Sequence, residues 1–497
     1  MATTKKSLTV RLAAGVGAVA LATLTALGTA LPASAAPNID ETATGSIVVH
    51  KLTQPVDGSQ LTAGTGALLD SATLPAAING VTFEIQRIGS FDVLDNDDWA
   101  TAGSLDVDAV LADPTTYGLV PAGTQVTATH AEFGTGVAAF TGLPLGAYVV
   151  RELGLPTAAD GEPNVVIPGA PFIVVIPQSA DGAWLYDVHV YPKNAVAGAT
   201  KSVEDFAHEG LGSAVTWTVR STAPVPSAGT SLDSYAIQDD LDATLDFVEG
   251  SVAVSVGSTV LTEGAGFTLS APAASGGSVV VTFDADGVAA LRANPGAAVT
   301  VQLSTAVIGV TASGALHNTA VITVNGAAAG TSVAAAVGGT ITSTTATDQW
   351  GSVVIRKHAA DDADDALAGA VFEIHDANGT ALAVLVDGTP QTQFTTGADG
   401  TVAIPGLRTD ADGEAYTLVE VEAPAGYVLP ADAETTVTVL PGSATAQVEI
   451  ANQQVPAYAL PVTGGSGQAA FMIGGAGLLL GALGFALLRR RKATAEV

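Results

Sequence analysis

The chain has 497 residues and a formal net charge of −31 at pH 7, with 17 Lys and Arg against 48 Asp and Glu. This balance argues against nucleic-acid binding, because phosphate groups must be met by Lys and Arg. Only 13% of the residues are charged, and short Val, Ile and Thr runs broken by Gly, Pro, Asn and Asp recur along the chain. That pattern predicts an all-β protein, and the length suggests about three domains.

The N-terminal residues have the pattern of a secretory signal peptide. Basic residues precede the apolar run 12–31, and the small residues of ASAAP follow it. This order predicts cleavage after Ala35 or Ala36. An uncleaved N-terminal membrane anchor is the alternative. An exported protein is free to form disulfides, yet the chain has no Cys, so any covalent staple in its domains must be of another kind.

Residues 37–196 are expected to form the first domain. Three of its strand-like runs are GSIVVHK, AYVVRE and VHVYPKN, which end at Lys51, Glu152 and Asn194. Side chains alternate between the two faces of a strand, so residues of equal parity share a face. Each of these three side chains shares its parity with Val, Ile or Tyr residues of its own run. All three are therefore expected on the buried face.

Lysine is rare in the exported part of the chain. Between the two ends that carry targeting signals there are four lysines, Lys51, Lys193, Lys201 and Lys357. Lys193 has the parity of His189 and Tyr191, opposite to that of Asn194, so it is expected to point outward with them. Pro192 has a fixed φ and no N–H, and it is expected to end strand pairing and keep Lys193 exposed.

Residues 197–348 are expected to form a different, middle domain. Lys201 lies in ATKSVED, Asp239 in YAIQDDLDATLDF and Asn318 in LHNTAVITVN. Parity places Asp239 with Tyr and Ile on the inner face and Asp240 on the outer face. The order Lys, acid, Asn is the same as in the first domain.

Residues 349–456 are expected to form a third domain that repeats the first. GSVVIRK ends at Lys357, AYTLVE at Glu420 and VEIAN at Asn452, and each run matches its counterpart in the first domain. All three side chains again have inward parity. The first domain is longer than the third, mostly between Ile85 and Ala147.

Residues 457–497 combine a short motif with an apolar stretch. The motif is LPVTG, formed by Leu460, Pro461, Val462, Thr463 and Gly464. The apolar stretch 469–488 is long enough to span a bilayer, and the basic residues 489–492 would hold its end inside the cell. The motif resembles the sorting signal of Gram-positive cell-surface proteins, in which a sortase cuts between Thr and Gly. A plain C-terminal membrane helix is the alternative.

Three buried sets of amine, carboxyl and carboxamide call for a chemical explanation, because unpaired buried charges are costly. Burial favours the neutral amine and the protonated acid. A neutral amine is a nucleophile, and the carboxyl can shuttle protons while the amine attacks the carboxamide and ammonia leaves. The predicted isopeptide bonds join first and last strands, and they are Lys51–Asn194 with Glu152, Lys201–Asn318 with Asp239, and Lys357–Asn452 with Glu420. The alternative is ordinary edge lysines, solvated acids and turn asparagines.

No metal-ligand cluster, phosphate loop or catalytic triad has recognisable spacing, so no metal or cofactor is expected. The acidic runs at 95–98 and 361–365 offer oxygen ligands of the kind that Ca²⁺ prefers. Solvated acidic loops are the favoured interpretation of both runs.

The chain resembles the sortase-assembled major (shaft) pilins of Gram-positive bacteria, of the SpaA and FimA type. WLYDVHVYPKN, residues 184–194, is similar to the pilin motif, and YTLVEVEAPAGY, residues 416–427, is similar to the E-box. Val421 stands where Thr is usual, and YVVRELGLP in the first domain is only a partial E-box. The resemblance implies Ig-like β-sandwiches, with outer domains of the collagen-adhesin B type and a middle domain of the A type.

The resemblance also implies a mechanism and a location. A pilin-specific sortase would hold Thr463 as a thioester, and Lys193 of another subunit would attack it. The polymer would be anchored to peptidoglycan by a housekeeping sortase after transient membrane retention. Partners would be identical subunits, minor pilins and host surface ligands, and the chain would not be a turnover enzyme. A monomeric wall-anchored adhesin, a tip or base pilin and a secreted surface hydrolase are the alternatives.

Overall fold

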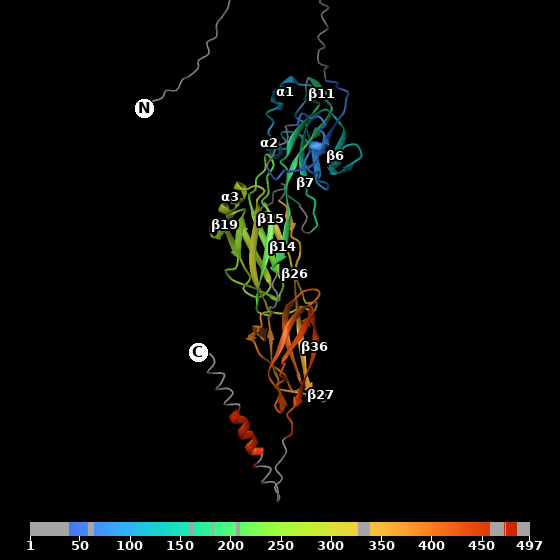
Figure 1. Ribbon diagram of the computed structural model, residues 1–497. Helices are drawn as coiled ribbons and strands as arrows, with labels where there is room; N and C mark the ends of the chain where they lie inside the picture. Colours follow the sequence, from blue (N-terminus) through green and yellow to red (C-terminus); the bar gives the residue numbers. More distant parts are fainter. Residues whose placement is uncertain are drawn as a thin grey trace, which may run out of the picture.

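The computed structural model describes residues 39–57, 64–159, 164–180, 182–204, 209–326, 338–457, 472 and 474–484. These residues form three β-sandwiches that follow one another along an elongated molecule (Figure 1). The prediction of an all-β protein is confirmed. Among the residues described, no helix is long and apolar enough to cross a membrane. The predicted cleavage sites Ala35 and Ala36, the LPVTG motif and both ends of the apolar stretch lie outside them.

The first sandwich contains three main sheets with the strand orders β12-β1-β6-β5, β2-β13-β8 and β4-β3-β7-β9, and a β10-β11 hairpin. Its strands are β1 (Gly45–His50), β2 (Leu52–Thr53), β3 (Thr82–Ile88), β4 (Leu119–Val126), β5 (Ala128–His130), β6 (Gly134–Leu143), β7 (Gly146–Gly154), β8 (Asn164–Ile167), β9 (Phe172–Ile176), β10 (Gln178–Ala180), β11 (Ala183–Leu185), β12 (Asp187–Val190) and β13 (Lys193–Ala197). The helices are η1 (Ser71–Thr73), α1 (Asn96–Ala102) and α2 (Val107–Ala112).

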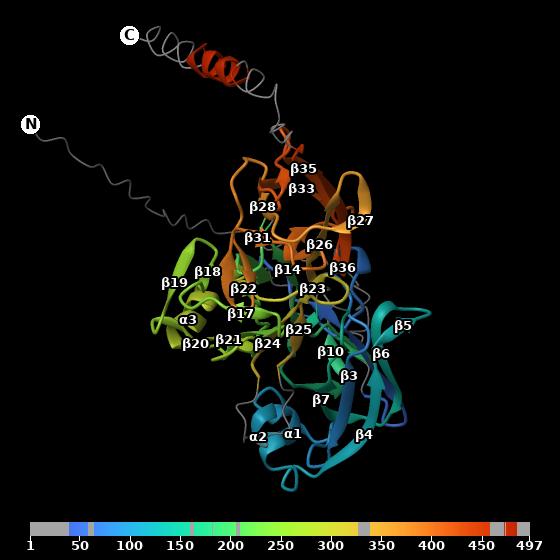
Figure 2. The same ribbon diagram turned by 90° about the horizontal axis from the view of Figure 1, so that it is seen from below.

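The extra length between Ile85 and Ala147 holds α1, α2, β4, β5 and β6. Asp95 is the N-cap of α1, and its side chain accepts a hydrogen bond from the Asp97 backbone. The acidic run at 95–98 therefore starts a helix rather than forming the expected loop. Both views show α1 and α2 on the first sandwich, away from the last one (Figures 1 and 2).

The middle sandwich is formed by one long sheet that folds on itself in the order β14-β15-β22-β18-β19-β20-β21-β16-β24-β25, with β17 paired to β22. Its strands are β14 (Ala199–Val203), β15 (Ala214–Thr222), β16 (Tyr235–Leu241), β17 (Leu245–Phe247), β18 (Ala253–Val256), β19 (Thr259–Glu263), β20 (Gly266–Ser270), β21 (Gly277–Phe283), β22 (Ala298–Val307), β24 (Ala320–Val324) and β25 (Thr340–Thr342). Helix α3 (Ala285–Ala293) packs on β20 and β21.

The last sandwich contains the sheets β26-β36-β34 and β31-β28-β33-β35 and a β29-β30 hairpin, and β27 and β32 also pair with β26. Strand β23 (Ala315–Asn318) of the middle sandwich extends the first of these sheets. Its strands are β26 (Ala346–Ala359), β27 (Asp362–Ala366), β28 (Val371–His375), β29 (Val384–Val386), β30 (Thr389–Gln391), β31 (Phe394–Thr395), β32 (Thr401–Thr409), β33 (Glu414–Glu422), β34 (Tyr427–Val428), β35 (Glu434–Val439) and β36 (Gly442–Gln454). Most of the acidic run at 361–365 is strand β27, an exposed strand rather than the expected loop.

The first and last sandwiches share a strand scaffold, as the internal repeat predicts. Strand β1 pairs in parallel with β12 in the first, and β26 pairs in parallel with β36 in the last. Strand β7 pairs with β3 so that Glu152 lies opposite Phe83, and β33 pairs with β28 so that Glu420 lies opposite Phe372. The two acids therefore occupy equivalent positions.

The middle and last sandwiches are joined by β26. Strand β23 (Ala315–Asn318) pairs with the start of β26, with Asn318 opposite Ala346, and β26 then continues into the last sandwich. The buried Arg408 donates to Asp348 of β26 at 2.8 Å, next to the junction. Because one strand belongs to both bodies, hydrophobic core residues of the two form one cluster that includes Trp217 and Trp350.

Candidate functional site

Lys51, Glu152 and Asn194 lie together inside the first sandwich. Lys51 directly follows β1, Glu152 is in β7 and Asn194 is in β13, and their exposed fractions are 0%, 7% and 0%. The Lys51 ammonium contacts one Glu152 oxygen, and the Asn194 amide nitrogen donates to the other at 2.8 Å. The carboxyl group therefore bridges the amine and the carboxamide.

Lys201, Asp239 and Asn318 lie inside the middle sandwich, on β14, β16 and β23, with exposed fractions of 5%, 1% and 1%. The Lys201 ammonium contacts Asp239. Asn318 lies beside Asp239 and helps to stabilise its charged form, although no contact of its carboxamide meets hydrogen-bond geometry. Asp240 points outward and accepts hydrogen bonds from Ser278 and Gln238.

Lys357, Glu420 and Asn452 lie inside the last sandwich, on β26, β33 and β36, with exposed fractions of 0%, 3% and 1%. The Lys357 ammonium donates to Asn452 Oδ1 at 2.5 Å. The Asn452 amide nitrogen donates to Glu420 Oε1 at 2.6 Å, and Lys357 Nζ lies 3.6 Å from Glu420 Oε2. This is a closed triangle of amine, carboxamide and acid.

Burial shifts the pKa values of the three lysines and of two of the acids in the direction that favours their neutral forms. Loss of solvation lowers the pKa of Lys51 and Lys357 and brings that of Lys201 to about 8, while the neighbouring acid opposes each shift. Loss of solvation also raises the pKa of Asp239 and of Glu420. In the middle and last sandwiches both shifts favour the neutral amine and the protonated acid, and a neutral amine is the nucleophilic form.

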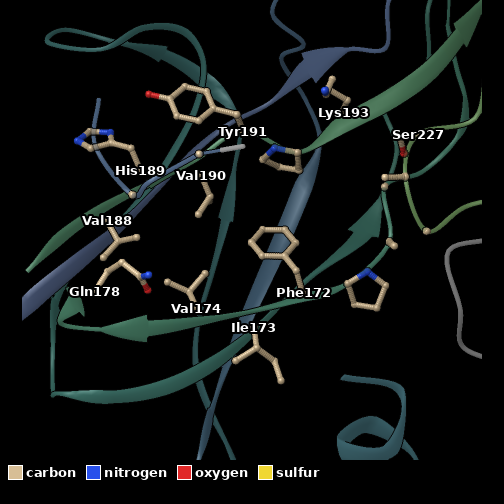
Figure 3. A pocket seen from close by; sticks show the side chains of 18 of the residues that line it. Phe172, Ile173, Val174, Gln178, Val188, His189, Val190, Tyr191, Lys193 and Ser227 are labelled. Atoms are coloured by element: carbon tan, nitrogen blue, oxygen red, sulfur yellow. The ribbon is translucent and has the colours of Figure 1, made fainter. Parts of the chain in front are cut away.

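Lys193 is placed differently from the other three lysines. Pro192 was expected to end strand pairing and keep Lys193 exposed, but Lys193 begins β13, pairs with Leu52 of β2 and is half-buried. It lines an open pocket of about 720 Å³. The pocket is also lined by Phe172 and Val174 of the first sandwich and by a loop of the middle sandwich at Ser227 (Figure 3). Partial burial lowers the Lys193 pKa. Its amine is thus both accessible from the pocket and easier to deprotonate than a solvated lysine.

Family models match the first sandwich, the last sandwich and the C-terminal residues of the chain. Residues 42–195 match the model of the Gram-positive pilin subunit D1 N-terminal domain, 351–454 match a prealbumin-like fold domain, and 457–494 match the LPXTG cell wall anchor motif. The chain is 33% identical to a fimbrial subunit type 2 of Actinomyces naeslundii, over 94% of each chain. The chain belongs to the Gram-positive fimbrial subunits.

Two further relatives of this fimbrial subunit are similar over most of their length. A fimbrial subunit type 1 of Actinomyces viscosus is 29% identical, over 97% of this chain and 98% of its own. The full-length major pilin SpaD from Corynebacterium diphtheriae is 28% identical with a TM-score of 0.65, over 84% of this chain and 99% of that one. With the LPXTG anchor, these relatives place the protein in pili on the cell surface, anchored to peptidoglycan.

His189 corrects one expectation drawn from strand parity. It was expected to point into solvent beside Lys193, but only 8% of it is exposed. Phe133 packs edge-on against its ring at 5.2 Å, and the His189 backbone N–H donates to Gly66. The outer face of β12 is therefore covered by other parts of the fimbrial subunit.

The middle sandwich corrects another expectation. Its Lys201 lies on the first strand, but Asn318 ends β23, and β24 and β25 still follow within the middle sandwich. A Lys201–Asn318 bond would therefore join the first strand to one before the last. In the first and last sandwiches the corresponding Asn lies on the final strand, β13 and β36.

Two features of the site were missed by sequence reasoning. His50, the residue before Lys51, is buried against His189 and Tyr191. Gly169 lies so close to the first triad that a Cβ there would approach a Glu152 oxygen at 3.1 Å and Lys51 Nζ at 3.2 Å. The HK pair at 50–51 was a visible signal for the first feature. The second depends on a loop packing that no local pattern shows.

Among the residues described, no group of three or more His, Cys, Asp or Glu side chains has the arrangement of a metal site.

Proposed function

We propose that this fimbrial subunit forms a covalent pilus shaft in which Lys193 of one copy is joined to Thr463 of the next. The sortase that cleaves after Thr463 would hold its carbonyl as a thioester. The Lys193 amine attacks that carbonyl, an amide forms, and the sortase thiol leaves. The observation that carries the proposal is the contrast between three lysines enclosed with an acid and an Asn, and a fourth that opens into a pocket.

The enclosed lysines are proposed to form internal isopeptide bonds. The Lys Nζ attacks the Asn Cγ, the Cγ–Nζ bond forms, the Cγ–Nδ2 bond breaks, and ammonia leaves. The acid accepts a proton from the amine and returns one to the departing nitrogen, so it is regenerated. Contact geometry such as the 2.5 Å between Lys357 Nζ and Asn452 Oδ1 gives a high effective concentration. Such proximity is worth about 7–11 kcal/mol of barrier at best.

These bonds would suit a shaft subunit without cysteine. A shaft transmits tension from end to end, and a bond between the terminal strands of a sandwich lets force bypass the hydrogen-bonded sheet. The relevant pairs are Lys51 with Asn194 and Lys357 with Asn452, which lie at the ends of parallel-paired strands. The reaction occurs once per site, so the subunit is a substrate of sortase and not a turnover enzyme.

The polymerisation test is a substitution of Lys193 by Ala in cells that produce the full-length chain. Detergent-resistant multimers should disappear, while secretion of the monomer continues. Replacement of Arg220, an exposed cation on β15, by Ala is the matched control and should leave the multimers intact. Multimers that persist without Lys193 would refute the proposed linkage and favour a monomeric wall-anchored adhesin.

The cross-link test is the intact mass of the secreted chain. Each bond formed lowers the mass by one ammonia, and three losses are expected. Peptide mapping would then find each Lys joined to its proposed Asn. A chain of unreduced mass would refute the internal chemistry without touching the polymerisation proposal.

A further inference from the structure

His50 and His189, which are both buried, form a ring cluster with the partly exposed Tyr191 beside Lys193. His50 Nε2 and His189 Nδ1 are 2.9 Å apart, so one ring donates a hydrogen bond to the other. The Tyr191 ring stacks on His50, with centroids 4.7 Å apart and 15° between the planes. Phe133 closes the cluster, edge-on to both histidines at 6.1 and 5.2 Å. Only 5% of His50 is exposed.

The ring cluster also holds segment 64–69. The Leu69 N–H donates to the Tyr191 hydroxyl at 2.6 Å, and the His189 N–H donates to the Gly66 carbonyl at 2.8 Å. Parts of this segment line the same pocket as Lys193. Figure 3 shows Tyr191 between His189 and Lys193 along one stretch of chain.

Tyr191 is separated from Lys193 only by Pro192. The proline ring fixes its own φ and restricts the residue before it, so this linker has little freedom. Beyond it, Lys193 and Asn194 pair with β2 at Leu52 and Thr53. A fixed Tyr191 on one side and β2 on the other therefore determine where the Lys193 amine can reach.

We propose that His50 and His189 are positioning residues for polymerisation, whose shared hydrogen bond holds Tyr191 and thereby holds Lys193 in the orientation that meets the sortase-bound acyl group. This inference rests on the proposed function, in which Lys193 is the nucleophile. The two rings act through Tyr191 and Pro192. They take no part in the bond-forming step.

The inference carries a pH dependence, because two protonated rings cannot share this hydrogen bond. The ionisable groups around the pair are His130 of β5, Glu132 in the turn before β6, Asp187 of β12 and Tyr191; Lys51, the next residue, is engaged with Glu152. Loss of solvation, with His189 and His130, lowers the pKa of His50 to about 4. Loss of solvation also lowers the pKa of His189, although Asp187 and Glu132 oppose that shift. His50 is therefore still neutral at pH 5, and only stronger acid should protonate both rings, separate them and release Tyr191.

The test compares full-length variants in cells that supply the sortase. His50→Gln and His189→Gln remove the ring pair, and His317→Gln is the matched control, because His317 is an exposed residue of the middle sandwich, paired with Thr347. Multimers formed in a fixed time are measured at about pH 7.5 and about pH 5, both above the His50 pKa of about 4. Each value is divided by wild type at the same pH, which cancels the pH response of the sortase and of the amine.

At about pH 7.5 the two ring variants should form multimers about fivefold more slowly than wild type, the equivalent of one net hydrogen bond. At about pH 5 their ratio to wild type should stay near one fifth, because His50 in wild type is still neutral there and still shares the hydrogen bond with His189. The ratio for His317→Gln should stay at one throughout. His50→Phe, which retains stacking on Tyr191 but cannot share a proton, should behave like His50→Gln.

Ring variants that match His317→Gln at both pH values would overturn the inference, as would a deficit that disappears at about pH 5 or a His50→Phe variant that forms multimers as fast as wild type. Loss of one ammonia in the first sandwich of each variant shows that it has folded, and His189→Gln or His50→Phe carries the test should His50→Gln not be secreted. Multimers that persist in Lys193→Ala would instead overturn the proposed function. The two failures are therefore distinguishable.

Discussion

Replacing Asn452 by Ala should destabilise the last sandwich strongly. The proposed bond to Lys357 closes a loop between residues 95 positions apart. By the chain-entropy argument used for disulfides, a cross-link over such a loop stabilises by about 4–5 kcal/mol. In the variant Lys357 still faces Glu420, at 3.6 Å in the wild-type arrangement, so its charge retains a partner. Most of the lost stability should therefore come from the missing bond.

The assay is thermal unfolding of the secreted chain, followed by the fluorescence of the fully buried Trp350. For a sandwich of about 100 residues each kcal/mol corresponds to about 4–8 °C, so the transition should fall by about 20 °C or more. Intact mass should show one fewer ammonia lost than in wild type.

Two comparisons make the result decisive. Glu420→Ala leaves both bonding partners but removes the acid, so it should also lose one ammonia fewer than wild type and show a similar loss of stability. Asn378→Ala, in an exposed turn of the same sandwich, should match wild type in both measurements. An Asn452→Ala chain with unchanged ammonia loss and unchanged unfolding would refute the argument for this cross-link.

Three further predictions concern the other two sandwiches. Asp239→Asn should block the loss of one ammonia from the middle sandwich while Asp240→Asn does not, as peptide mass mapping would show, because only Asp239 is buried against the amine. Asn318→Ala should leave Lys201 as a free amine with a pKa of about 8 in the folded chain. Between about pH 8 and 10.5 the unfolded chain then binds more protons than the folded chain, so the free energy of unfolding measured in urea should rise by about 3 kcal/mol across that window. A flat pH profile would contradict this. Glu152→Gln should prevent the first-sandwich bond, and a variant that still loses all three ammonias would show that Glu152 is not its acid.

Strand parity predicted burial well where a run has a single covered face. Lys51, Lys201 and Lys357, with Asn194 and the other triad members, are all buried, because inward parity in a two-sheet sandwich leaves a side chain no other place. The preference for Asp239 over Asp240 follows from the same geometry and agrees with their burial.

Parity failed where a third element covers the outer face of a strand. Alternation predicts that His189 and Asn194 lie on opposite faces, but it does not predict which face is exposed to solvent. Phe133 and the segment at Gly66 and Leu69 come from distant parts of the chain and bury His189 and hold Tyr191. No pattern within WLYDVHVYPKN reveals that cover.

The amino-acid order alone determined the β character, the repeat of first and last sandwiches, and the membership of the acid–amine–amide sets, because these follow from alternation and from matching runs. The tertiary structure decided the contacts that no local sequence pattern predicts. It brought Lys357 and Asn452 to 2.5 Å, placed Lys193 in a pocket between two sandwiches, and paired His50 with His189. Each of these depends on contacts between residues far apart in the chain, whose distances are set by packing.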